Sequence, residues 1–217
     1  MCFSASASLT AGAGLLIIGA IAVSQSKTTP QRVLASIPVI FSVQQVSEGL
    51  LWLSLSGAIS IKWQNLFMYI FQVFAQVLWP TFVPLTILLF EKNVRRRQIL
   101  RILLAVGMLT SLYLCWCLLF YNVSAMIEGH HIKYELDFPL GNRWFSGITY
   151  ILAAVMAPFI SSVRQMRLLG LLLLVSYLVS RIFYQDYLIS VWCYFAAILS
   201  ISILIIIRGL RKAEISA

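Results

Sequence analysis

The residues best suited to chemistry in this sequence are a few polar side chains set inside long apolar stretches. The clearest stretch, "FSVQQVSEGLLWL", carries Gln44, Gln45 and Glu48. At helical spacing Gln44, Glu48 and Trp52 share one face, and Gln45 adjoins Glu48 at i and i+3. A carboxyl group inside hydrocarbon is costly and is a site candidate by default. We therefore predict that Glu48, Gln44 and Gln45 form a catalytic group. The alternative is a protonated glutamate that only joins two helices.

A second set of residues has the side chains that bind metals. His130 and His131 are the only histidines, Cys2 follows the first methionine, and Cys193 lies in "SVWCYFAA". Two cysteines, one histidine and one carboxylate are a plausible zinc ligand set. We predict that Cys2, Cys193, one of the two histidines and Glu48 hold a zinc-like metal. The alternatives are a Cys2–Cys193 disulfide and a solvated histidine pair, of which at most one ring points inward.

The other two cysteines are not site candidates. Cys115 and Cys117 stand two residues apart in "LYLCWCLLF", so in a helix their side chains point about 200° apart. They cannot bridge each other without breaking the helix. We interpret them as small apolar fillers.

The segments that must position these residues are apolar enough to cross a membrane. The chain is 61% hydrophobic and 11% charged, whereas a soluble domain is nearer half apolar and a quarter charged. The net charge of +9 comes from short basic clusters between apolar runs, which is typical of a multi-pass membrane protein and not of a nucleic-acid-binding one. A spanning helix needs ~20 apolar residues. Seven segments qualify, at about 5–24, 33–55, 63–90, 99–121, 144–163, 168–184 and 187–207.

The basic residues also predict an orientation. With the N-terminus outside and the C-terminus cytoplasmic, the inner connections hold 12 of the 16 Lys and Arg residues, as the positive-inside rule requires. We thus predict one all-α integral membrane domain over 1–217 in the plasma (inner) membrane, with a kink at Pro80 and Pro84. Its first segment lacks the basic start of a signal peptide and is expected to be retained. The outer loop, 122–143, places the site toward the periplasm or exterior.

The motifs "MCFSASAS", "QQVSEGLLWL", "LWPTFVP", "HHIKYEL" and "SVWCYFAA" together resemble a family of small bacterial integral membrane proteins of unknown function. The resemblance covers nearly the whole chain and names no reaction. It implies that the matched positions are Cys2, Ser4, Gln44, Gln45, Glu48, Trp52, Trp79, Pro80, His130, His131, Tyr134, Trp192 and Cys193. Cys115 and Cys117 are not among them.

Three active functions compete on this sequence, and a fourth possibility is a structural or sensory protein whose polar cluster only specifies helix packing. The first is a zinc-dependent enzyme in the bilayer that hydrolyses or hydrates a small or lipidic substrate, with Glu48 as fourth ligand or general base. The second is a transporter that uses Glu48 and the intramembrane glutamines, including Gln72 and Gln76. The third is a thiol redox protein that uses Cys2 and Cys193. We rank the enzyme first, and the sequence does not predict an oligomeric state.

Overall fold

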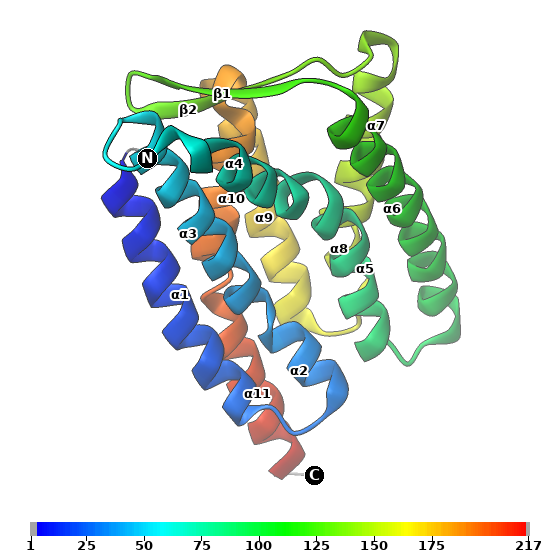
Figure 1. Ribbon diagram of the computed structural model, residues 1–217. Helices are drawn as coiled ribbons and strands as arrows, with labels where there is room; N and C mark the ends of the chain where they lie inside the picture. The colour runs from blue at the N-terminus through cyan, green and yellow to red at the C-terminus, as the bar shows by residue number, and fades with distance from the viewer. Residues whose placement is uncertain (1–3, 216–217) are drawn as a thin grey trace.

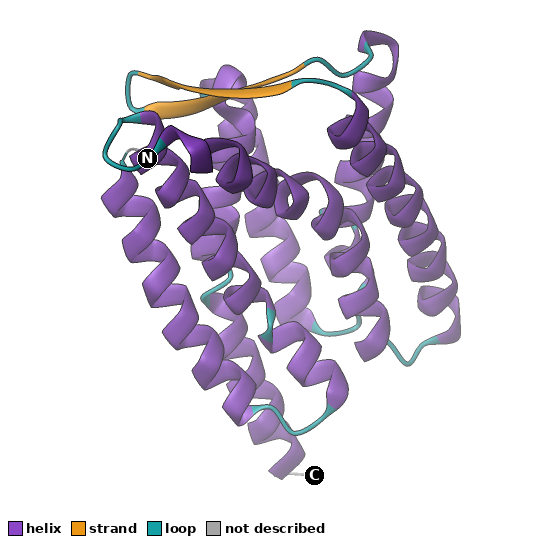
Figure 2. Ribbon diagram, in the orientation of Figure 1, coloured by secondary structure: helices purple, strands orange, loops and turns teal. Residues whose placement is uncertain are grey.

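The computed structural model describes residues 4–215, and side chains within this range except those of 140–143 and 211–215. The chain forms a helical bundle whose two termini lie at opposite ends, and a two-stranded sheet covers one end (Figures 1 and 2). The helices are α1 (Ala5–Gln25), α2 (Thr29–Ala35), α3 (Ile37–Leu55), α4 (Gln64–Gln72), α5 (Trp79–Phe90), α6 (Val94–Phe120), α7 (Leu140–Ala154), α8 (Ala157–Ile160), α9 (Arg164–Phe183), α10 (Leu188–Leu199) and α11 (Ser202–Ile215). The strands are β1 (Val123–Glu128) and β2 (His131–Leu136).

Six helical segments in the described part of the chain are long and apolar enough to cross a membrane. They are Ala5–Gln25, Thr29–Leu55, Ile61–Phe90, Val94–Phe120, Arg164–Phe183 and Gln185–Leu210. The segment Trp144–Ile160 is also apolar but shorter, and it ends in the separate turn α8. The predicted helical fold is confirmed, with helices near all the predicted positions and six of these segments long and apolar enough to cross a membrane.

Several of these segments are interrupted, and prolines explain two of the interruptions. Pro38 lies in the first turn of α3, where its missing N–H is tolerated, and the chain bends at Ser36 between α2 and α3. A π-helical segment, Val73–Leu78, joins α4 to α5 just before Pro80. As a result α4 runs across the bundle beneath the sheet and α5 then follows the bundle axis (Figure 1). The predicted kink is thus realised mainly as a π-helix.

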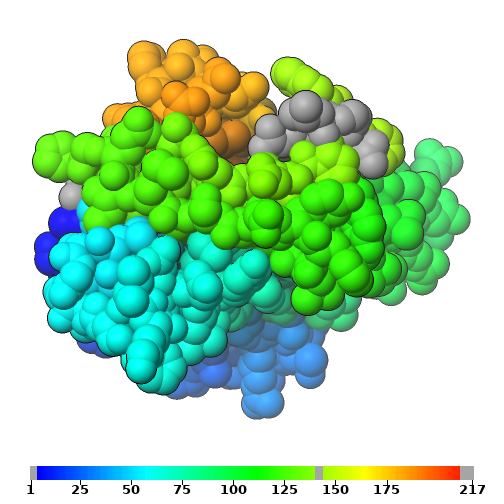
Figure 3. Space-filling view, turned by 45° about the horizontal axis from the view of Figure 1, so that its top comes forward, coloured from blue at the N-terminus to red at the C-terminus, as the bar shows by residue number. Residues whose placement is uncertain are grey.

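The connection predicted as the outer loop over 122–143 contains a β-hairpin, after which α7 begins at Leu140. Six pairs join the strands, from Val123 with Leu136 to Glu128 with His131. The two-residue turn begins at Gly129, whose φ of +61° favours glycine. The sequence alternates apolar and polar residues here, and that period of two was overlooked. Figure 3 shows the hairpin lying across the end of the bundle.

Close helix contacts at glycines shape the bundle near the site. Gly12 and Gly19 of α1 leave space for Val46 and Val39 of α3, and Gly49 of α3 leaves space for Leu9. These contacts hold α1 against one face of α3. The other face of α3, which carries Glu48, therefore turns toward the interior of the bundle.

Candidate functional site

The carboxyl group of Glu48 lies in the interior of the bundle, two turns from the hairpin end of α3. Its side chain is fully buried. The Ser190 hydroxyl, from α10, donates a hydrogen bond of 2.6 Å to Oε1. The Cys193 thiol, one turn further along α10, lies close enough to interact electrostatically with the same carboxyl group. Glu48 and Ser190 are 142 residues apart in sequence. Their hydrogen bond therefore joins α3 and α10 in one polar centre.

Gln44 extends this centre by one helical turn toward the far end. The indole Nε1–H of Trp79, from α5, donates to Gln44 Oε1 at 3.0 Å. Tryptophan can only donate, so this bond fixes the amide with its oxygen toward Trp79 and its NH₂ group away from it. Trp79 is itself held by stacking on Phe41, with ring centroids 4.1 Å apart. Gln44 also adjoins the Cys193 thiol.

Several buried polar atoms on α3 and on the neighbouring α4 have no hydrogen-bond partner among the described residues. They include Glu48 Oε2, Gln44 Nε2, both amide atoms of Gln45 and of Gln72, and Trp52 Nε1. Gln44, Gln45, Glu48 and Gln72 are each 0% exposed. Buried polar groups in native proteins are almost always paired, with protein, ordered water or ligand. This cluster therefore has the character of a binding site for water or a polar ligand.

One face of β2 covers the site at the hairpin end of the bundle. Ile132 and Tyr134 are buried and point toward the bundle. The Tyr134 ring stacks on Phe71 of α4 at 5.1 Å, and its hydroxyl adjoins the Glu48 carboxyl group. Tyr134 also lines a recess beside the segment 185–189, immediately before Ser190. Tyr134 thus meets both that recess and the Glu48 carboxyl group.

The two histidines lie on other parts of the hairpin. His130 is exposed in the turn. His131 is on the strand face opposite Tyr134, where its ring stacks on Tyr187 at 4.6 Å and meets Tyr184 edge-on at 5.4 Å. Burial lowers the pKa of the His131 imidazole. Of the pair, His131 is the more buried, but it packs against these tyrosines.

The proposed metal ligands are only partly brought together. Glu48 and Cys193 are neighbours, whereas Cys2 lies outside the described residues. Within 4–215, no group of three or more His, Cys, Asp and Glu side chains is arranged to hold a metal ion. Cys193, Cys115 and Cys117 are free thiols.

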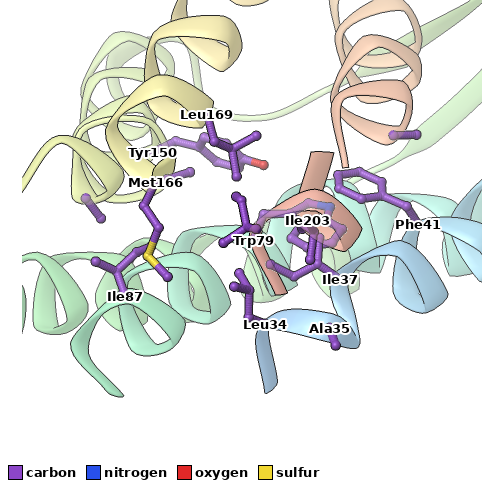
Figure 4. Close-up of a cluster of buried hydrophobic side chains, with 14 of the residues drawn as sticks. Leu34, Ala35, Ile37, Phe41, Trp79, Ile87, Tyr150, Met166, Leu169 and Ile203 are labelled. Carbon is purple, nitrogen blue, oxygen red and sulfur yellow. The ribbon is translucent and has the colours of Figure 1, made fainter. Parts of the chain in front are cut away.

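An apolar cavity begins at the same centre and runs toward the opposite end of the bundle. Trp79 and Cys193 line both the polar cluster and the cavity. The space open to the centre of a water-sized molecule is about 70 Å³. Figure 4 shows a cluster of buried hydrophobic side chains from several helices, and most of its labelled residues line this cavity. Its walls include Leu34, Ile37, Phe41, Tyr150, Leu169 and Ile203.

The π-helix sets the wall of this cavity. In a π-helix each carbonyl pairs with the N–H five residues on, so Ala75 would need an N–H from residue 80. That residue is Pro80, which has none. The Tyr150 hydroxyl, from α7, donates to Ala75 O at 2.7 Å instead. The hydroxyl proton of Tyr150 is therefore engaged in a hydrogen bond within the cavity wall.

The site contains two residues that sequence reasoning missed. Ser190 stands three residues before Cys193, so the i, i+3 rule could have placed both on the Glu48-facing side of one helix. Tyr150 carries no such signal, because its partner is a backbone carbonyl freed by a distant proline. Gln72 was named only in the transporter hypothesis, and its buried amide makes no hydrogen bond among the described residues.

Fold and site together define a multi-helix protein of membrane character with a buried polar centre. The chain belongs to the family of unknown function DUF6629, whose model matches residues 1–217. This agrees with the resemblance to an uncharacterised membrane family. No curated protein and no solved structure matches the chain.

Proposed function

We propose that this chain is a seven-span membrane enzyme that hydrolyses or hydrates a small or lipidic substrate at Glu48. The observation that carries the proposal is a fully buried carboxyl group on a helix that bears further buried polar atoms without hydrogen-bond partners among the described residues. Ionisable groups at this depth are expensive and are kept where they act on a ligand. With basic residues inside, the hairpin and the site face the periplasm or exterior, and the C-terminus is cytoplasmic.

The proposed chemistry uses Glu48 as a general base toward water. Ser190 donates to Oε1 and so orients the carboxyl group, which leaves Oε2 to accept a proton from a water molecule. The water oxygen bonds to the carbonyl carbon of the substrate. In hydrolysis the bond to the leaving group then breaks, and Glu48 returns the proton to that group. The fixed NH₂ group of Gln44 is suited to stabilise the oxyanion that forms.

A bound metal would strengthen the same reaction by polarising the carbonyl or activating the water. Glu48 and Cys193 offer two ligand types that zinc accepts, and we propose Cys2 as the third. His131 would have to leave Tyr187 to join them. Metal analysis of protein purified without chelators tests this part: we expect zinc in wild type and its loss in Cys193→Ser. If wild type contains only background metal, the metal part of the proposal is refuted and the general-base part remains.

The reaction itself is tested with lipid extracts. Purified wild type is incubated with total membrane lipid, and products are followed by mass spectrometry against time. Glu48→Gln keeps the shape of the side chain and an acceptor for Ser190, so we expect a folded protein whose turnover falls about 10²- to 10⁴-fold. Glu135→Gln, an exposed carboxylate on β2, is the matched control and should retain activity. Equal turnover in all three proteins would refute the role of Glu48.

Transport is the second candidate, since the glutamines are buried near Glu48. A polar path would have to continue beyond Gln44, but the walls there present hydrocarbon. Solute uptake into proteoliposomes that is lost in Glu48→Gln, without any lipid turnover, would favour transport over the enzyme.

A further inference from the structure

A partly polar recess lies at the hairpin end of the bundle, between β2 and the segment that leads into α10. Its walls are Tyr134 and Leu136 on one side and residues 185–189 on the other. The space open to the centre of a water-sized molecule is about 170 Å³. One water molecule needs ~10–15 Å³ on this measure, so the recess has room for a small hydrated molecule.

The segment 185–189 runs from the surface toward the carboxyl group of Glu48. Asp186 is exposed, Ile189 is half-buried, and Ser190, the next residue, is fully buried. The Ser190 hydroxyl donates its hydrogen bond of 2.6 Å to Glu48 Oε1. One wall of the recess is therefore a continuous stretch of chain that leads from the surface to the polar centre.

Tyr134, on the other wall, also reaches the polar centre. Its side chain lines the recess, and its hydroxyl adjoins the Glu48 carboxyl group. The ring stacks on Phe71 with centroids 5.1 Å apart, which holds it in place. Ser190 and Tyr134 thus approach the same carboxyl group from the two sides that form the recess.

The charges around the recess favour a ligand without negative charge. Lys133 pairs with Glu128 at 3.5 Å and with Glu135 at 3.7 Å. Asp186, which lines the recess, also interacts with Lys133. Three carboxylates around one ammonium group leave a negative field beside the opening, and such a field attracts cations and repels anions.

The apolar cavity beside Cys193 is less suited to a hydrophilic molecule. The space open to the centre of a water-sized molecule is about 70 Å³ there, against about 170 Å³ in the recess. In its wall the hydroxyls of Thr86 and Ser200 already donate to carbonyls three or four residues earlier in the chain. One donor of a residue in this wall, Trp192 Nε1, has no partner among the described residues. A polar molecule therefore finds more space and more polar groups in the recess.

We infer that the recess is the entrance to Glu48, and that the substrate is a small, water-soluble carbonyl compound without negative charge. This inference rests on the proposed function and narrows its substrate to the small, hydrophilic class. Gln185 and Asp186 would meet the polar groups of the substrate at the opening, and the Tyr134 hydroxyl would meet them at the inner wall.

The test uses protein in nanodiscs and two membrane-impermeant thiol reagents of opposite charge, trimethylammonioethyl and sulfonatoethyl methanethiosulfonate. Ile189→Cys places a thiol in the wall of the recess, and peptide mass spectrometry measures its modification against time. With each rate divided by that of free mercaptoethanol, we expect the cation to react about tenfold faster than the anion. Asp186→Asn in the same protein should remove this preference. An unreactive thiol at position 189 would overturn the inference.

Two further Ile→Cys variants are matched controls. Ile61 is 73% exposed at the hairpin end but does not line the recess, so Ile61→Cys should react with both reagents and show no preference for the cation. Ile198, farther along α10, is exposed on the side of the bundle, and Ile198→Cys should be unreactive in a bilayer. All variants must elute as wild type does and keep its thermal midpoint within a few degrees. The same cation preference at Ile61→Cys would overturn the selection by Asp186.

The two proposals fail in different ways. The cationic adduct on Ile189→Cys fills the recess and should abolish turnover that depends on Glu48. Turnover of membrane lipid that depends on Glu48 and persists in this adduct would refute the entrance alone. Modification as expected, in a protein whose turnover does not depend on Glu48, would refute the catalytic role alone.

Discussion

The hydrogen bond from Tyr150 to Ala75 O gives the sharpest test of the architecture around the site. Tyr150→Phe removes only a hydroxyl group, and it leaves a buried carbonyl that Pro80 cannot satisfy. An unsatisfied buried acceptor costs about 1–3 kcal/mol. We expect the free energy of unfolding to fall by that amount, measured by SDS titration in mixed micelles with helical circular dichroism.

Tyr177→Phe is a closely matched control. Both tyrosines meet Trp192 edge-on, at 5.8 Å for Tyr150 and 5.1 Å for Tyr177. No hydrogen bond of the Tyr177 hydroxyl stands among those described, so its loss should change stability by less than about 0.5 kcal/mol. Equal effects of the two substitutions would refute the reasoning.

A double-mutant cycle tests the cause directly. Pro80→Ala restores an N–H at the position where the π-helical register needs one for Ala75 O. In that background Tyr150→Phe should cost less than in wild type, by about 1 kcal/mol. An unchanged cost would mean that Pro80 is not the reason for the bond.

Three further predictions concern the ends and contacts of the bundle. Burial alone would raise the pKa of Glu91, but donors from the backbone of the same loop and from the α8–α9 connection outweigh it and lower the pKa below the ordinary 4.5. The resulting stability is therefore full above about pH 4.5 and is lost as the pH falls through the lowered pKa, so unfolding curves of wild type and Glu91→Gln should converge in acid; a gap that widens in acid would refute this sign. Gly107→Ala places a methyl group against the carbonyl oxygen of Pro80 and should destabilise by about 1–3 kcal/mol, whereas Gly14→Ala meets no atom and should be neutral or stabilising in the same SDS titration. Gly129→Ala strains a turn residue at positive φ and should lower the free energy of unfolding by about 1 kcal/mol in the same titration. An unchanged free energy of unfolding would contradict this prediction.

Much of the candidate site could be predicted because polar residues are easily recognised within segments that are otherwise apolar. Glu48, Gln44 and Gln45 stood out by their chemistry inside an apolar segment, and local helical spacing placed Gln44 and Glu48 on one face. Cys193 was selected by residue type, and the structure places it beside Glu48. At most one of the two histidine rings was predicted to point inward. The hairpin register decides which one packs against other residues: His131 stacks on Tyr187 and His130 is exposed.

The sequence by itself determined the class of structure, because long apolar runs leave a chain few ways to satisfy its backbone other than helices. Only the tertiary structure decided the partners: Ser190 for Glu48, Trp79 for Gln44, and Tyr150 for the carbonyl that Pro80 leaves free. Each of these contacts joins segments far apart in the chain, and their meeting depends on how whole helices pack. The apolar cavity has the same origin, since no single helix encodes it and several must meet around it.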